Sequence, residues 1–184
     1  RILSAGHDRQ AIVWNCNDHS QVMRLELTTE IVAADLSPDG RLLATVQKGE
    51  KVVQLWSVPD KQPRGTLAGH TDAIHWVRFR HDGEALLTAS ADGTARVASF
   101  DDRELALFKV GKTVVHAAWT RDGSRVLTSS SSDDNQARLW NVADGSEQLH
   151  FGGHDNTVVC NAFSPDGQWA LTTSHDGTAR VWPT

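Results

Sequence analysis

The stretch SADGTARVA at residues 90–98 nearly recurs as SHDGTARVW at residues 174–182. The two stretches agree at seven of nine positions and begin 84 residues apart. Self-similarity at a fixed spacing is the signature of a repeat architecture, in which each repeat is one supersecondary unit. A shorter period that divides 84 would place further copies between these two stretches.

Tryptophan recurs with a period of 42 residues, half of that spacing. Counting back from the end of the second stretch gives Trp182, Trp140, Ala98, Trp56 and Trp14. A second ladder, six residues upstream, consists of Asp176, Asp134, Asp92, Glu50 and Asp8. A Gly-His dipeptide ends at His70 and again at His154, with Gly111-Lys112 midway between them. Because two independent ladders share one period, the repetition is not coincidental.

Each unit reads as a succession of short β-strands. The first strand is seen in AIHWVRF (73–79), VVHAAW (114–119) and VVCNAF (158–163), each followed by a tight turn that contains Asp-Gly. A second strand, an Asp-containing turn and a third strand such as TARVW follow, and a fourth runs into the next junction. Helical spacing with caps is absent from the sequence. The sequence therefore predicts an all-β protein of four-stranded antiparallel units.

Four-stranded units that recur every ~40–45 residues, with a Gly-His and a terminal dipeptide related to Trp-Asp, are typical of β-propellers. On these residues the chain resembles the WD-repeat family, and the resemblance covers its whole length. The family's terminal Trp-Asp never occurs literally, since the dipeptides read Trp14-Asn15, Trp56-Ser57, Ala98-Ser99, Trp140-Asn141 and Trp182-Pro183. Asn and Ser can still hydrogen-bond the turn that follows the third strand.

The expected architecture is a β-propeller segment of 42-residue repeats that forms one domain over residues 1–184. Complete blades are expected at 28–69, 70–111 and 112–153, between partial blades at 1–27 and 154–184. The two partial blades share two strand types, so they cannot merge into one four-stranded sheet. We therefore expect an incomplete, open arc that belongs to a ring of about seven or more blades.

The resemblance implies a buried polar chain in each blade. In it the Asp of the second turn bonds the His of the junction, and a strand hydroxyl links that His to the Trp. The complete set is expected only in the last unit, at His154, Thr172, Asp176 and Trp182. The unit 70–111 keeps His70, Thr88 and Asp92 but has Ala98 in place of the indole, and the unit 112–153 keeps Asp134 and Trp140. We expect the blade with Ala98 to be the softer one, because a missing core aromatic costs packing.

Composition narrows the function classes. The net charge is −5 and Lys and Arg are scattered, which argues against nucleic acid and against a basic membrane patch as partners. The two cysteines, Cys16 and Cys160, lack the spacing of a zinc site or disulfide framework, and Cys160 is expected to be a packing residue. No apolar run approaches ~18 residues and no export signal is visible, so a cytoplasmic location is expected.

The leading functional hypothesis is a non-catalytic scaffold or sensor that binds a protein or peptide, within a larger chain or assembly. No catalytic residue, metal or cofactor is expected. One alternative is the C-terminal sensor region of a larger signalling NTPase or kinase. The other is a propeller enzyme with a metal site in the central channel, for which the innermost strands offer His75 and His116 but no matching carboxylates.

The partner is expected on the propeller face that carries the Gly-His and Asp-containing loops. Near the start of each first strand, one residue should point toward the channel mouth: Val32, His75, Val115 and Val159. Loop residues that precede the ladder acids, His7, Asp133 and His175, should flank them. Apolar side chains rimmed by polar ones are typical of binding sites. Arg96, Arg138 and Arg180, which recur 42 residues apart, are expected to cover a neighbouring blade with their stems and keep their charged ends in water.

Overall fold

The computed structural model describes residues 1–131 and 134–184, and within them it contains strands and no helix. No described segment is therefore a helix long and apolar enough to cross a membrane. The strands form five antiparallel sheets, in which three four-stranded sheets lie between two three-stranded ones. The predicted all-β fold of four-stranded antiparallel units is confirmed.

The strands of each sheet pair in chain order. The first sheet contains β1 (Ile2–Ala5), β2 (Gln10–Trp14) and β3 (Gln21–Glu26). The second contains β4 (Ile31–Leu36), β5 (Leu42–Gln47), β6 (Val53–Ser57) and β7 (Gln62–Leu67). The third contains β8 (Ile74–Phe79), β9 (Leu86–Ser90), β10 (Thr94–Ala98) and β11 (Glu104–Lys109). The fourth contains β12 (Val114–Trp119), β13 (Arg125–Ser130), β14 (Ala137–Asn141) and β15 (Glu147–Phe151), and the fifth contains β16 (Val158–Phe163), β17 (Trp169–Ser174) and β18 (Ala179–Pro183).

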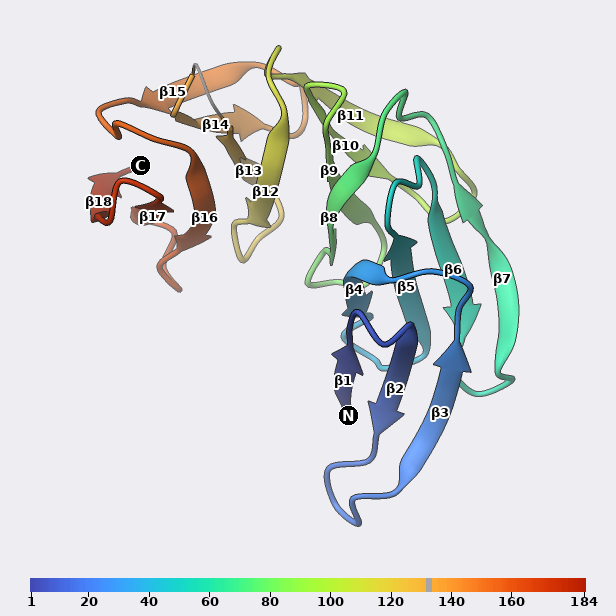
Figure 1. Ribbon diagram of the computed structural model, residues 1–184. Coiled ribbons are helices and arrows are strands. Elements are labelled where there is room, and N and C mark those ends of the chain that lie inside the picture. Colours follow the sequence, from blue (N-terminus) through green and yellow to red (C-terminus); the bar gives the residue numbers. More distant parts are fainter. Residues whose placement is uncertain (132–133) are drawn as a thin grey trace.

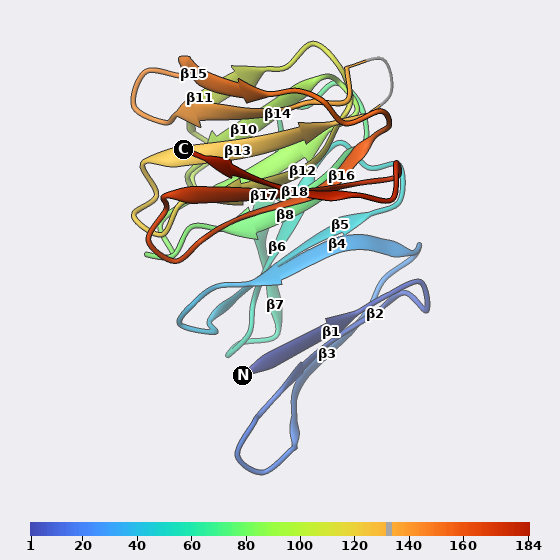
Figure 2. The same cartoon turned by 90° about the vertical axis from the view of Figure 1, so that its left-hand side faces the viewer.

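The five sheets follow one another along an open arc, with the two termini at its two ends (Figure 1). Strands β4, β8, β12 and β16 line the concave side of the arc and are called the inner strands below. Seen from the side, the sheets lie over one another like the leaves of a fan, with the N-terminal sheet at one end (Figure 2). The arc does not close, as the overlapping partial units predict.

The turns after the inner strands share one local chemistry. Asp39, Asp82, Asp122 and Asp166 each accept a hydrogen bond from the backbone N–H two residues further on, at 2.9–3.1 Å. The following glycine has a φ of 69–76° in all four turns. That backbone region is strained for residues with a Cβ, so Asp-Gly fixes the turn and with it the pairing of the inner strand with the second strand.

Each inner strand carries a β-bulge at the same place. In β12, for example, Val114 pairs with Ser130 and His116 with Ser129, so Val115 has no partner of its own. The same shift in register occurs in the other three inner strands. The bulged residues are Val32, His75, Val115 and Val159. Because a bulge bends the strand and re-aims a side chain, these four residues share one distinctive position.

The apolar core lies between neighbouring sheets. Phe108 on β11 faces Trp140 on β14 of the next sheet, with 5.6 Å between ring centroids. Phe151 on β15 faces Trp182 on β18 in the same way, at 5.5 Å. Offset aromatic pairs of this kind stabilise beyond the area that they bury. Each sheet is therefore held mainly by its neighbours along the arc.

The face of the last sheet that points away from the arc is apolar and uncovered. Leu171 and Val181 pair across β17 and β18 and are 39% and 62% exposed. Leu87 and Val97 pair in the same way across β9 and β10 and are fully buried by the next sheet. The face around Leu171 thus has the composition of a surface that another sheet covers.

A fragment of residues 1–184 alone is therefore expected to self-associate. Its two end sheets present apolar faces and unpaired strand edges, which pair readily with other chains. Sedimentation velocity over a tenfold range of concentration should show a sedimentation coefficient that rises with concentration. The double substitution Leu171→Lys and Val181→Lys should reduce that rise. A compact monomer at all concentrations would contradict the expectation.

Candidate functional site

The bulged residues lie together at the start of the inner strands, on the edge of the sheets that carries the junction loops. Val32 and His75 are exposed, whereas Val115 and Val159 are half-buried. The inner strands of the second to fifth sheets lie side by side, so these residues succeed one another around the mouth of the channel. We call Val32, His75, Val115 and Val159 the mouth residues.

Two of the expected flanking residues are exposed on loops at the same edge. His7 lies 3.6 Å from Glu30, measured from Nδ1 to Oε2. His175 is exposed, and its backbone N–H bonds the carbonyl of Thr157. Glu30 also pairs with Lys48 at 2.9 Å, and this hydrogen bond and charge lower the pKa of Glu30. Asp133, the third flanking residue, lies outside the described residues.

The wall of the channel below the mouth is built around His116. Its ring lies 4.2 Å from that of Trp76, and its Nε2 lies 3.7 Å from Cys160 Sγ. Burial lowers the pKa of His116 to about 4, so the ring is neutral near pH 7. Cys160 is exposed, so the expectation of a packing residue was wrong: the side chain follows the bulge at Val159 and faces the channel.

The metal-site alternative meets a sparse set of ligands here. His75 is exposed, while His116 is enclosed by Trp76 and Cys160. Among residues 1–131 and 134–184, no three His, Cys, Asp or Glu side chains are grouped so that they could hold a metal ion. Stable metal sites in proteins require three or four such ligands.

The polar chain expected in the last unit is continuous in the structure. His154 Nδ1 lies 2.8 Å from Asp176 Oδ2, and His154 Nε2 lies 2.8 Å from Thr172 Oγ1. The indole N–H of Trp182 donates to the same Thr172 oxygen at 2.9 Å. Because the carboxylate accepts from Nδ1–H, Nε2 accepts the Thr172 proton, and the hydroxyl oxygen is left to accept from the indole.

The unit 70–111 repeats this chain without its last member. His70 lies 2.8 Å from both Asp92 and Thr88. Burial lowers the pKa of His70, so the imidazole is neutral. Burial by itself would raise the pKa of Asp92, but hydrogen bonds from Thr94, Thr71 and His70 outweigh it and lower the pKa to about 2. The carboxylate is therefore ionised and is held by several donors.

The unit 112–153, in which Lys112 replaces the histidine, satisfies its ladder acid differently. Arg138 donates to both carboxylate oxygens of Asp134, one of them at 2.9 Å, and Ser130 donates at 2.6 Å. The Arg138 hydrogen bond is the main reason that the pKa of Asp134 is lowered. The expectation that Arg138 keeps its charged end in water was wrong, since its side chain is only 16% exposed.

Gln47 has the corresponding task in the second sheet, where the unit begins with Leu27-Thr28. Its Oε1 accepts hydrogen bonds from the hydroxyl of Thr28 at 3.0 Å and from the backbone N–H of Thr29 at 3.1 Å. The 42-residue ladder pointed to Glu50 instead, which is exposed. The shift of one residue in the turn between β5 and β6 hides Gln47 from a search based on spacing alone.

The fold and the recurring polar chain define a β-propeller assembled from four-stranded blades. Residues 61–99, 106–141 and 145–183 match the WD domain, G-beta repeat family. The chain therefore belongs to the WD-repeat family, as its resemblance predicted. Members of this family are typically non-catalytic scaffolds that bind proteins within larger assemblies.

Several curated proteins are similar to the chain. Protein FIZZY-RELATED 3 of Arabidopsis thaliana is 28% identical over 99% of the chain and 39% of its own length. Echinoderm microtubule-associated protein-like 3 of Homo sapiens is 27% identical over 100% of the chain and 20% of its own length. Apoptotic protease-activating factor 1 of Rattus norvegicus is 28% identical over 72% of the chain and 10% of its own length. The chain spans two fifths or less of each of these relatives.

Proposed function

We propose that the chain is a non-catalytic interaction module that binds a protein or peptide at the channel mouth. The observation that carries the proposal is the bulge shared by all four inner strands, which sets one side chain per strand at the same edge. Three of these four side chains are valines. A row of apolar groups at an open rim suits a partner better than it suits water.

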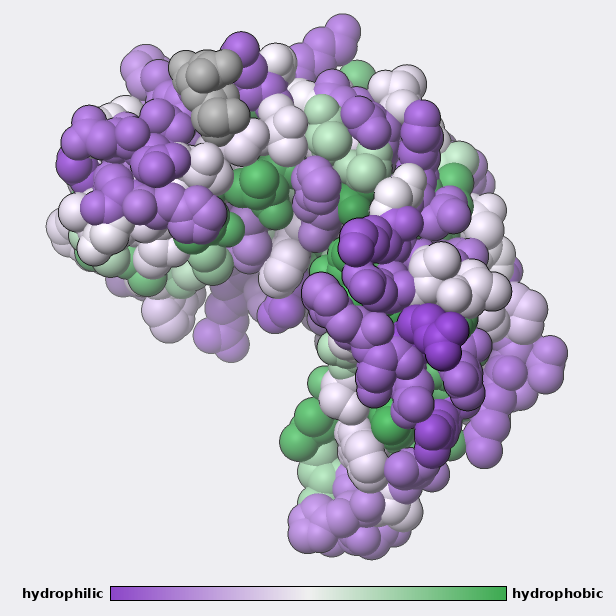
Figure 3. Space-filling model, viewed as in Figure 1, coloured by the Kyte–Doolittle hydropathy of each residue, from purple (hydrophilic) through white to green (hydrophobic). Residues whose placement is uncertain are grey.

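The surroundings of the mouth support the proposal. His7, Glu30 and Lys48 provide a polar rim beside Val32, and His175 does so on the last sheet. Figure 3 shows small apolar patches on the concave side of the arc within a mostly hydrophilic surface. An apolar centre with a polar rim is the usual anatomy of a protein interface.

The module is proposed to work as one region of a larger protein in the cytoplasm. The relatives are several times longer than the chain, and their names describe a transcription initiation factor subunit, a microtubule-associated protein and a protease-activating factor. Among these, the protease-activating factor suits the hypothesis of a sensor region in a signalling protein. Cys16 and Cys160 are free thiols, which suits a reducing compartment. The scattered positive charge favours protein over nucleic acid or membrane as the partner.

The combined substitution Val115→Glu and Val159→Glu is expected to abolish partner binding. Two carboxylates at the mouth would have to be desolvated by any apolar contact, which is costly without a paired charge. The measurement is affinity capture from the source cells with the intact protein, followed by quantitative mass spectrometry against the wild type. Partners that depend on the mouth should fall at least tenfold in abundance.

Arg121→Glu together with Gln168→Glu provides the matched control. Both residues are exposed in turns after the inner strands β12 and β16, so they lie on the opposite face. Circular dichroism and thermal melts should show that both double variants remain folded. Retained binding in the mouth variant, together with loss in the control, would move the site to the opposite face.

A further inference from the structure

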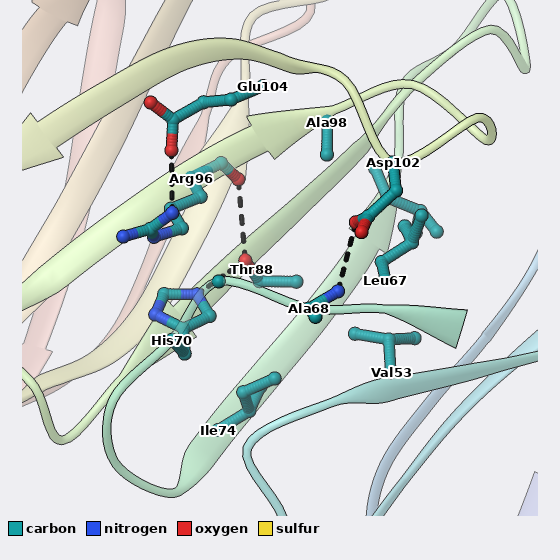
Figure 4. Close-up of a pocket in the computed structure, with 12 residues that line it drawn as sticks. Val53, Leu67, Ala68, His70, Ile74, Thr88, Arg96, Ala98, Asp102 and Glu104 are labelled. Atoms are coloured by element: carbon teal, nitrogen blue, oxygen red, sulfur yellow. Dashed lines mark hydrogen bonds and ion pairs between the residues drawn. The ribbon is translucent and has the colours of Figure 1, made fainter.

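A pocket of about 320 Å³ lies where Ala98 interrupts the tryptophan ladder. It opens between the second and third sheets and is formed by residues of both. Its floor consists of the buried apolar side chains Val53, Leu67, Ile74 and Leu86. Figure 4 shows Ala98 and Thr88 on one side of this space and Val53 and Leu67 on the other. We call it the Ala98 pocket.

The other four sheets show what occupies this position. In each of them an indole N–H donates to a hydroxyl of the neighbouring strand at 2.9–3.0 Å: Trp14 to Ser4, Trp56 to Thr45, Trp140 to Thr128 and Trp182 to Thr172. Trp140 and Trp182 also lie against a phenylalanine of the preceding sheet. Leu67 has the place of that phenylalanine here, since it pairs with Val53 as Phe108 pairs with Ala95. The smaller leucine widens the pocket.

The polar partner of the missing indole is still in place. Thr88 Oγ1 bonds His70 at 2.8 Å, as Thr172 bonds His154, and it is buried. The neutral His70 accepts the hydroxyl proton because Asp92 accepts from its other nitrogen. The Thr88 oxygen therefore offers a lone pair to the pocket, and no described N–H occupies it as Trp182 occupies Thr172. A buried acceptor without its donor favours a ligand that supplies one.

The nearest aromatic ring does not fill the space. The ring of Phe100 lies 5.8 Å from that of Phe79 and lines another hollow, together with Asp39 and Leu42. The rim of the Ala98 pocket is polar: Asp102 accepts from the backbone N–H of Ala68 at 2.9 Å, and Glu104 pairs with Arg96 at 2.6 Å. Such a pocket, with an apolar floor and a few fixed polar groups, is typical of ligand sites.

We propose that the Ala98 pocket binds an indole group, a flat bicyclic aromatic ring with one N–H donor directed at Thr88. The ring would lie over Leu67 and Val53, and its N–H would complete the chain that runs through Thr88, His70 and Asp92. The pocket is formed by two complete sheets inside the arc, so it does not depend on further blades. The indole can belong to a small molecule or to a tryptophan of a partner, and the experiment separates these sources.

Isothermal titration calorimetry on the intact protein tests the proposal with free indole and with the capped peptide acetyl-Gly-Trp-Gly-amide. Indole is expected to bind with a stoichiometry of one. Benzofuran has the same shape but no N–H, so it should bind about five- to tenfold more weakly. Binding of indole without the peptide assigns the site to a small molecule, whereas peptide binding equal to or tighter than that of indole assigns it to a partner's tryptophan.

Ala98→Trp should abolish indole binding because the introduced side chain fills the pocket. Ala98→Leu, a smaller change, should weaken binding at least tenfold and decides the question if the tryptophan variant does not fold. Leu149→Trp is the matched control, since it adds the same side chain at an exposed position of another sheet and should leave binding unchanged. The proposal is overturned if neither probe binds the wild type, or if indole binds the folded Ala98 variants as well as it binds the wild type.

Discussion

Replacing Trp140 by alanine is expected to lower the free energy of unfolding by about 3–5 kcal/mol. The side chain is 5% exposed, its indole N–H donates to Thr128 at 2.9 Å, and its ring lies against Phe108 of the preceding sheet. Alanine would remove all of these contacts and open a cavity between two sheets. Chemical denaturation of the intact protein, followed by circular dichroism, measures the change.

Trp140→Phe separates the contribution of packing from that of the hydrogen bond. Phenylalanine keeps the contact with Phe108 and loses the donor to Thr128, so the expected loss is about 1–2 kcal/mol. The two variants should therefore rank clearly. Equal losses would show that the hydrogen bond, and not the packing between sheets, determines the effect. The natural alanine at position 98 indicates that the fold tolerates one such loss when the other sheets keep their indoles.

Replacing Asp92 by alanine is expected to cost about 3–5 kcal/mol, because several buried donors lose their common acceptor. The carboxylate is 4% exposed. It accepts from His70 at 2.8 Å, from the backbone N–H of Thr71 at 3.0 Å, and from the backbone and hydroxyl of Thr94 at 2.9 and 2.6 Å. One residue thus joins the junction loop to the turn between β9 and β10.

Glu50→Ala is the matched control, because Glu50 stands at the same rung of the ladder in the preceding sheet. Its side chain is exposed, and Gln47 makes the junction hydrogen bonds there. Substitution at such a surface position is expected to change stability by no more than about 0.5 kcal/mol. A loss in Glu50→Ala as large as that in Asp92→Ala would show that the rung, and not the buried carboxylate, is what matters.

The contribution of Asp92 should also depend on pH. Its pKa in the folded protein is about 2, below the ordinary value of 3.8, so the unfolded chain binds the proton more readily. The stabilisation is then complete above pH 3.8 and is lost as the pH falls toward 2. Unfolding of the wild type should show a steeper loss of stability over this window than unfolding of Asp92→Asn. Identical slopes would contradict the assignment of a charged, hydrogen-bonded Asp92.

Much of the fold and of the polar chain follows from the sequence by itself. The 42-residue ladders set the units, and the Asp-Gly turns and alternating strands set the strand order, because these features act over short distances within one unit. His154, Thr172, Asp176 and Trp182 could be picked out together because partners within a unit recur at fixed spacing. The absence of tryptophan at Ala98 is equally visible in the sequence.

Only the tertiary structure decided what the departures from the pattern do. Arg138 neutralises Asp134 where the histidine is missing, and Gln47 bonds the junction one residue away from the expected position. Neither is visible from spacing, since a compensating side chain is chosen by reach and burial. Ala98 leaves an open pocket because Leu67, on the neighbouring sheet, is smaller than the phenylalanines in its place elsewhere. Packing between sheets joins residues of different units, and the ladder of one unit cannot encode its neighbour's side chains.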